Sequence, residues 1–169
     1  RIKARKHHDP LSPDEHFGRL FDICVEKGSE LPLGHKDRKY KGRVVFQGSV
    51  VLNQSYEVAR FSDMANAPAT LEASAACDFY GCFPGNICWQ ADAEQAYCQA
   101  FLGDYKTWIR LPKDRWPPEW YDENGNCLYE DPVCPLILAL YGHPKSGKYW
   151  EEHAERMLID ELYWTAIDG

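Results

Sequence analysis

Hydrophobic positions recur along this chain with two spacings, one typical of helices and the other of strands. Residues 12–28, SPDEHFGRLFDICVEKG, open with a helix-start pattern in which Ser12 suits the N-cap and Pro13 the first turn. Glu15 completes a capping box, and Gly28 suits a helix end. Four apolar residues share one helical face: Phe17, Leu20, Phe21 and Cys24. The pattern predicts a helix over residues 12–28.

Runs of β-branched and aromatic residues predict strands elsewhere. The expected strands are RKYKGRVVFQGSVVLN at 38–53 (a basic strand or hairpin), ICWQA at 87–91, TWIRLP at 107–112 and VCPLILALY at 133–141. Asn124-Gly125 is the commonest two-residue signal for a hairpin turn.

Further helices are expected at 67–81, APATLEASAACDFYG, and at 148–164, KYWEEHAERMLIDELYW. A short Ala-rich helical turn is expected after Asp92. The order of elements lacks regular β-α-β alternation and contains a hairpin. It therefore predicts an α+β fold in packed layers, not a doubly wound parallel sheet.

Charge is divided unevenly along the 169 residues, whose formal net charge is −7. Residues 1–50 hold 11 Lys and Arg against 7 Asp and Glu, whereas residues 51–169 hold 8 against 19. The most basic stretch is HKDRKYKGR at 35–43, which suits either a solvated hairpin or an anionic partner.

Other bulk features limit the class of protein. The seven cysteines form no C-x-x-C pair, which disfavours a structural zinc site and favours reduced thiols inside a cell. The sequence has no apolar run long enough to cross a membrane and no signal-peptide pattern, so we expect no membrane partner. The chain opens with Arg1 inside a basic string, which suggests a piece of a longer protein.

The stretch GHPKSGKY, residues 142–149, completes the G-x-x-x-x-G-K pattern of a phosphate-binding P-loop. Tyr149, however, stands where the magnesium-binding Ser or Thr belongs. Pro144 lacks the N–H group that such a loop presents to phosphate. These two departures argue against an NTPase.

A second candidate site is QADAEQAY, residues 90–97. An Asp after a strand is a good helix N-cap, and Tyr97 in an Ala-rich turn fits ordinary packing. Polymerases also use this arrangement, because two-metal phosphoryl transfer needs carboxylates at strand ends. The residues alone leave both interpretations open.

Four blocks in order resemble the reverse transcriptase of copia-type retrotransposons: KYKGRVVFQG, QADAEQAYCQAFL, TWIRLP and PVCPLILALYGHPKSGKYW. The resemblance covers roughly residues 36–160. It implies a partial right-hand polymerase fold, with fingers and the N-terminal part of the palm built from an antiparallel sheet and packed helices. Residues 1–169 would form one partial domain, fingers-like over about 1–86, with partial palm, fingers return and final helix over about 87–169. The glycine-lysine pattern at 142–148 then matches a P-loop by coincidence.

The resemblance assigns roles to the second block. Asp92 corresponds to the catalytic aspartate that ligates two Mg²⁺ (or Mn²⁺) ions, and the Ala93 carbonyl adds a ligand. Gln95 and Ala96 lie where main-chain N–H groups meet the triphosphate. Tyr97 corresponds to the gate that excludes the ribose 2′-OH. We expect Asp92 at the end of a central antiparallel strand, facing a cleft.

The first and fourth blocks supply the remaining implied contacts. Arg43, with Lys41 nearby, would contact the triphosphate and face the same cleft as Asp92. Gly142 would approach the nascent base pair, and Lys145 and Lys148 would touch template phosphates. The implied partners are an RNA or DNA template with its primer and deoxynucleoside triphosphates. The implied location is intracellular, in a cytoplasmic virus-like particle or the nucleus.

One departure opens an alternative function. The family's Y-x-D-D hairpin, which supplies the other catalytic carboxylates, does not occur in these residues. The rest of the palm, the thumb and the ribonuclease H region are also missing from them. The chain is thus expected to be a polymerase fragment that is inactive alone. The alternative is a decayed or domesticated, non-catalytic remnant that binds nucleic acid.

Overall fold

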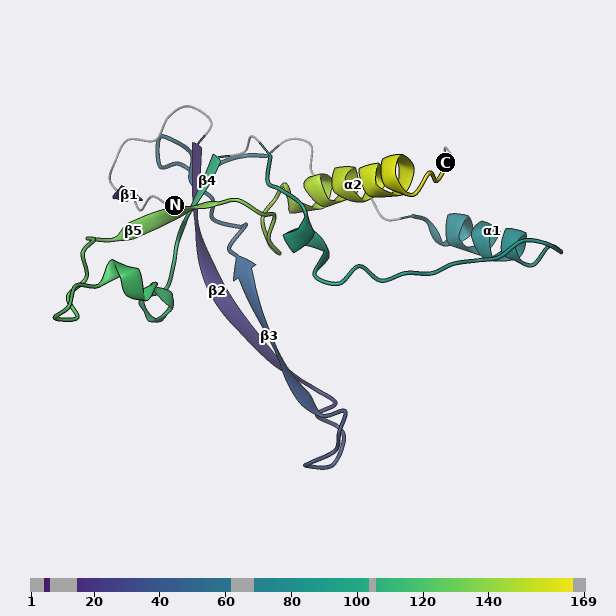
Figure 1. The fold of residues 1–169 in the computed structure, drawn as a ribbon, viewed down its shortest axis with the longest axis horizontal. Helices are drawn as coiled ribbons and strands as arrows, with labels where there is room; N and C mark the ends of the chain where they lie inside the picture. Colours follow the sequence, from purple (N-terminus) through teal and green to yellow (C-terminus); the bar gives the residue numbers. More distant parts are fainter. Residues whose placement is uncertain (1–4, 7–14, 62–68, 104–105, 166–169) are drawn as a thin grey trace.

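The computed structural model describes residues 5–6, 15–61, 69–103 and 106–165 (Figure 1). Its strands form one sheet in the order β1-β5-β4-β2-β3. The strands are β1 Arg5–Lys6, β2 Glu15–Lys27, β3 Lys39–Phe46, β4 Lys106–Arg110 and β5 Pro132–Leu136. With the helices described below they make a small α+β fold, as predicted.

The sheet is mixed, whereas an antiparallel sheet was expected. β2 pairs with β3, and β4 with β5, in antiparallel fashion, but β2 and β4 run parallel. Nearly eighty residues separate these two strands in the chain, and a parallel pair needs a long connection of this kind. The sheet joins strands from both sides of residue 86, and the predicted division of the chain there stays a prediction.

The helix predicted over residues 12–28 is wrong, because residues 15–27 form β2. Pairing runs from Leu20 opposite Phe46 to Lys27 opposite Lys39 and supplies partners for the backbone. β-Branched residues at alternate positions, Ile23 and Val25, also favour the strand. Ser12 and Pro13 lie outside the described residues. β2 and β3 project as a long two-stranded arm (Figure 1).

The other helices form where expected. α1 covers Leu71–Gly81, and the Thr70 side chain caps it by accepting the Ala73 N–H at 3.1 Å. α2 covers Ser146–Arg156 and continues into the π-helical turn η4, Met157–Glu161. The Ala-rich segment after Asp92 is the 3₁₀ turn η1, Ala96–Gln99. Two more 3₁₀ turns are η2, Lys113–Arg115, and η3, Pro118–Trp120. No helix in the described residues is long and apolar enough to span a membrane.

The strand predicted at 87–91 does not form. These residues run as an extended segment beside α1 (Figure 1), and Ile87 and Trp89 are 79% and 81% exposed. A strand needs a neighbour to satisfy its N–H and C=O groups, and no described strand pairs with this segment. The turn at Asn124-Gly125 does form, with the Gly125 N–H donating to the Asp122 carbonyl at 3.0 Å.

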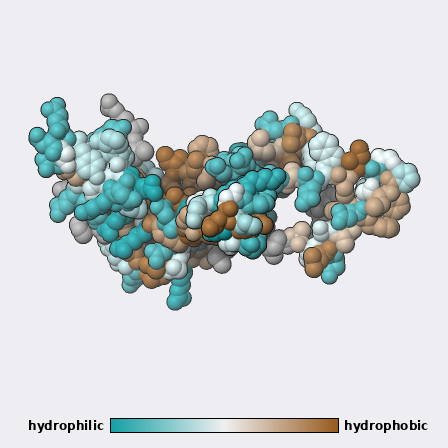
Figure 2. All heavy atoms as spheres, turned by 90° about the horizontal axis from the view of Figure 1, so that it is seen from below, coloured by the Kyte–Doolittle hydropathy of each residue, from teal (hydrophilic) through white to brown (hydrophobic). Residues whose placement is uncertain are grey.

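The core lies between the sheet and the chain that follows β3 and β5. One buried cluster contains Phe46, Val51, Ile109 and Cys134. A second contains Ala100, Leu102 and Ala139 beneath α2 and η1. By contrast, α1 buries none of its residues. In Figure 2, apolar surface is visible at the end of the molecule that carries α1.

Candidate functional site

The loop 141–145, between β5 and α2, crosses the end of β3 at very short range. A Cβ added to Gly142 would lie 2.1 Å from the Phe46 carbonyl oxygen, and one added to Gly48 would lie 2.0 Å from the Gly142 oxygen. Gly142 also has a φ of +88°, a backbone conformation that favours glycine. The Phe46 N–H donates to the Tyr141 carbonyl at 2.7 Å. Two glycines therefore let the loop bind directly to the backbone of the strand.

His143 anchors the same loop on its buried side. Its ring is buried, with Nδ1 accepting the Lys145 N–H at 3.2 Å and Nε2 lying 3.1 Å from the Thr107 hydroxyl. Because Nδ1 accepts a hydrogen bond, Nε2 carries the proton of the neutral ring, and this N–H donates a hydrogen bond to the Thr107 hydroxyl oxygen. Burial, and then the positive charges of His16 and Lys145, lower the pKa of His143 to about 4. The anchor is neutral at physiological pH.

Several N–H groups that a P-loop would leave open to phosphate are bonded inside this loop. The N–H groups of His143 and Ser146 donate to the carbonyls of Leu140 and His143, at 3.1 and 3.0 Å. The Lys145 N–H is bound to the His143 ring. Ser146, at the start of α2, exchanges two hydrogen bonds with the Leu140 backbone through its buried hydroxyl. These donors are occupied within the loop, which supports rejecting an NTPase.

Tyr97 meets this loop from the second block. η1 sets its ring 4.7 Å, centroid to centroid, from the ring of Tyr141. The same side chain packs on the cluster of Ala100, Leu102 and Ala139. Gln95, just before the turn, has a φ of +51°. Its carbonyl accepts the Cys98 N–H at 2.8 Å, and Ala96 is half-buried beside it. Tyr97 and Gly142 thus flank Tyr141.

Asp92 and Ala93 lie apart from any strand end. Both are exposed in the extended segment between α1 and η1, so the expectation of a central strand ending at Asp92 is wrong. No group of three or more His, Cys, Asp or Glu residues suited to a metal ion occurs in the described part of the chain. One exposed carboxylate does not fit a two-metal centre by itself.

Lys41 and Arg43 lie on one face of β3, opposite Val25 and Ile23 of β2. This placement agrees with the alternation expected from sequence. Arg43 is exposed and borders a groove of about 590 Å³ between the arm and the turn at Leu111–Arg115.

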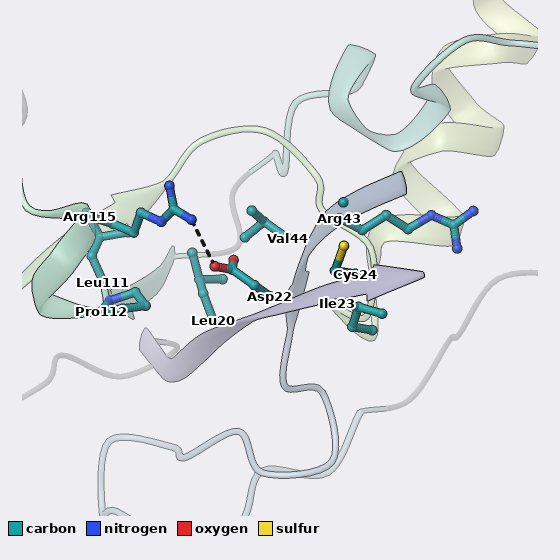
Figure 3. A pocket seen from close by; sticks show the side chains of 10 residues that line it. Leu20, Asp22, Ile23, Cys24, Arg43, Val44, Leu111, Pro112 and Arg115 are labelled. Carbon is teal, nitrogen blue, oxygen red and sulfur yellow. Dashed lines mark hydrogen bonds and ion pairs between the residues drawn. The ribbon is translucent and has the colours of Figure 1, made fainter. Parts of the chain in front are cut away.

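The groove is mainly apolar and has one ion pair. Asp22 Oδ2 lies 3.2 Å from the Arg115 guanidinium, and Arg43 extends away from that pair (Figure 3). Asp92 is absent from the described residues that line this groove. The structure therefore does not bring Arg43 and Asp92 into one cleft, because Asp92 lies in the segment after α1 and Arg43 lies on β3 of the arm.

The two lysines of the loop differ. Lys145 is only 7% exposed, which argues against contact with a template. The Lys148 Nζ lies 3.8 Å from Glu152 Oε1, one helical turn along α2. Lys148 remains partly exposed, so its predicted contact with template phosphates stays a prediction.

Sequence reasoning missed two members of this site. In the sequence, His143 is only one position of the stretch GHPKSGKY, and Thr107 only one position of a predicted strand. A histidine between Gly142 and Pro144 is a weak signal of a buried anchor, and nothing near Thr107 in the sequence marks it as a partner. Comparisons with protein-family models, curated proteins and solved structures give no match for this chain.

Proposed function

We propose that this chain is part of an RNA-directed DNA polymerase of the copia retrotransposon type, comprising the fingers and the first part of the palm. One observation carries the proposal. Tyr141-Gly142, from the fourth sequence block, contacts Phe46 and Gly48 of the first block and Tyr97 of the second. These segments are far apart in sequence, and their meeting is what a shared nucleotide site requires.

Each part of the junction suits a role in that site. Gly48 and Gly142 let the two backbone segments meet, and Gly142 stays exposed at the crossing, where a base pair can approach it. Beside them is a surface hollow of about 460 Å³ that includes Gln47 and Ser49. Tyr97 contributes a rigid ring at the edge of the junction, suited to excluding a ribose 2′-OH.

The arm suits an anionic partner. Lys39, Lys41 and Arg43 line one face of β3, and Lys27 of β2 lies opposite Lys39. All four are exposed, and the described ion pairs include none of them. Such a basic face attracts the phosphates of a template-primer duplex or an incoming triphosphate. Asp92 and Ala93 remain the proposed metal ligands, with Mg²⁺ or Mn²⁺ requiring further carboxylates from elsewhere in the polymerase.

A non-catalytic nucleic-acid-binding remnant is the second candidate. The exposed, extended position of Asp92 favours it, since a polymerase aspartate needs a fixed position beside the metals. Both candidates share the basic arm, so binding of nucleic acid tests them together and DNA synthesis separates them.

The binding experiment titrates a labelled RNA–DNA hybrid with the chain at several salt concentrations. We expect affinity to fall with salt, and Lys41→Ala and Arg43→Ala each to reduce the slope by about 1. Lys113→Ala is the matched control, because it removes one exposed Lys from η2, outside the arm. Equal effects of all three substitutions, or no binding at low salt, would contradict the proposed role of the arm.

A further inference from the structure

The chain after α1 folds back, so that the Cys88 side chain contacts the backbone of the helix. Its thiol donates to the Cys77 carbonyl oxygen at 3.2 Å, although the two residues are eleven positions apart. Gly81 makes room for this contact, since a Cβ at that position would lie 2.6 Å from the Cys88 Sγ and 3.0 Å from its Cβ. The sulfur thus occupies a slot that only glycine leaves open.

Other contacts hold the return segment, residues 82–88, against the end of α1. The Asn86 side-chain amide donates to the Tyr80 carbonyl at 2.9 Å. The Phe79 and Phe83 rings meet edge to face with centroids 5.2 Å apart. The turn between them is closed by the Phe83 N–H, which donates to the Tyr80 carbonyl at 3.2 Å. The approach of Cys88 to the helix is therefore supported at several points.

The contact with the Cys77 carbonyl brings the Cys88 sulfur near the Cys77 side chain. A carbonyl oxygen lies about 3 Å from the Cβ of its own residue, so the Cys88 Sγ is within about 6 Å of the Cys77 Cβ. Closing a disulfide then requires rotation of the two side chains together with a small shift of residues 82–88 toward α1. Both residues are exposed and therefore open to reagents in solution.

We propose that Cys77 and Cys88 are a redox-responsive pair that closes into a disulfide with a low-molecular-weight disulfide, such as glutathione disulfide, as the oxidant. One cysteine thiolate attacks the oxidant, breaking its S–S bond and releasing one glutathione thiolate. The second cysteine thiolate attacks the mixed disulfide and releases the other glutathione. The two cysteine protons end on the two glutathione thiols, and the protein sulfurs are oxidised as glutathione disulfide is reduced.

Closure has a structural consequence. α1 buries none of its residues, so few tertiary contacts restrain it and the segment that follows. A bond between residues 77 and 88 closes a short covalent ring that fixes this segment on the helix, a few residues before Asp92. Oxidation would thereby stiffen the exposed end of the molecule and leave the sheet unchanged.

The experiment equilibrates the chain with glutathione buffers of increasing oxidation, blocks free thiols and maps cysteines by peptide mass spectrometry. We expect the 77–88 disulfide to exceed glutathione adducts on these two residues by roughly tenfold, because ring closure has a high effective concentration. Cys82→Ser, which removes a neighbouring exposed cysteine, should leave this ratio unchanged. Cys77→Ser should convert Cys88 to the glutathione adduct.

A second variant tests the geometry. Gly81→Ala fills the slot and should lower the closed fraction by roughly tenfold at the same redox potential, because its methyl group displaces the Cys88 sulfur. Independent glutathione adducts on Cys77 and Cys88 in the unmodified chain would overturn the proposal. So would a disulfide from Cys88 to Cys82, or closure undiminished by Gly81→Ala.

Discussion

Two parts of this molecule use glycine in the same way and differ in what surrounds it. At the loop 141–145, Gly142 and Gly48 let two backbones touch above a buried core. At α1, Gly81 lets Cys88 reach the helix, but no residue of α1 is buried. A hydrogen bond to a backbone carbonyl accompanies each contact, and burial adds stability to only the first. A helix end with complete hydrogen bonds can therefore still be poorly anchored to the rest of the molecule.

Removing one aromatic side chain from each part should give the largest difference in the free energy of unfolding. Phe46→Ala empties a fully buried position and should lower the free energy of unfolding by about 3–5 kcal/mol. Phe79→Ala on α1, where the side chain is 69% exposed, should cost about 1 kcal/mol or less. Urea unfolding followed by circular dichroism measures both. Equal losses would mean that α1 is anchored as firmly as the sheet.

Acid should lower the free energy of unfolding through His143, which anchors the loop 141–145. Its pKa in the folded state is about 4, below the ordinary value of 6.5, so between these pH values the unfolded chain takes up a proton that the folded ring refuses. Stability should be complete above about pH 6.5 and fall by about 3 kcal/mol as pH drops to 4.

The measurement is the free energy of unfolding across that pH range, for the unmodified chain and for His143→Gln. The variant should lose most of the slope, because Gln has no titrating group. His35→Gln is the matched control, since it removes an exposed histidine from the tip of the arm. If both variants keep the full slope, another group causes the acid sensitivity.

Two glycines with nearly the same backbone conformation show how much stability depends on the tight crossing of loop and strand. Gly142 has a φ of +88° and Gly34 a φ of +84°, but only Gly142 has atoms in the way of a Cβ. Gly34→Ala should cost about 1 kcal/mol from backbone conformation alone. Gly142→Ala should cost about 2–3 kcal/mol, because the loop must also move off the Phe46 carbonyl. The difference in the urea midpoints of the two variants checks this, and similar midpoints would show that the crossing of loop and strand is not tight.

Local signals predicted the elements whose causes are local. α1 and the turn at Asn124-Gly125 form where the sequence indicates, because helix propensity and turn chemistry act within a few residues. β2 was mistaken for a helix because Phe17 and Phe21 share one face in either structure. Pairing with β3, which no single segment reveals, decides between them.

The roles assigned to the candidate site residues stay predictions. The fold does bring two of the sequence blocks together, because the Tyr97 ring of the second block packs against Tyr141 of the fourth, next to Gly142. The prediction that Asp92 ends a strand is wrong. An apolar run such as 87–91 becomes a strand only when it pairs with a neighbouring strand. The anchor formed by His143 and Thr107 depends on two segments that meet only after folding.

Primer extension tests whether this chain is part of a DNA polymerase, as we propose. The 169-residue chain alone should make no DNA with any template, primer and Mg²⁺, because Asp92 is the only metal-binding side chain that we assign to it. Joined to the polymerase region that we propose follows it, the chain should extend a primer on an RNA template. Asp92→Asn should abolish that extension, and Asp78→Asn, which alters an exposed carboxylate on α1, should leave it unchanged. Robust extension by the isolated chain, or full activity of the joined Asp92→Asn variant, would contradict the account.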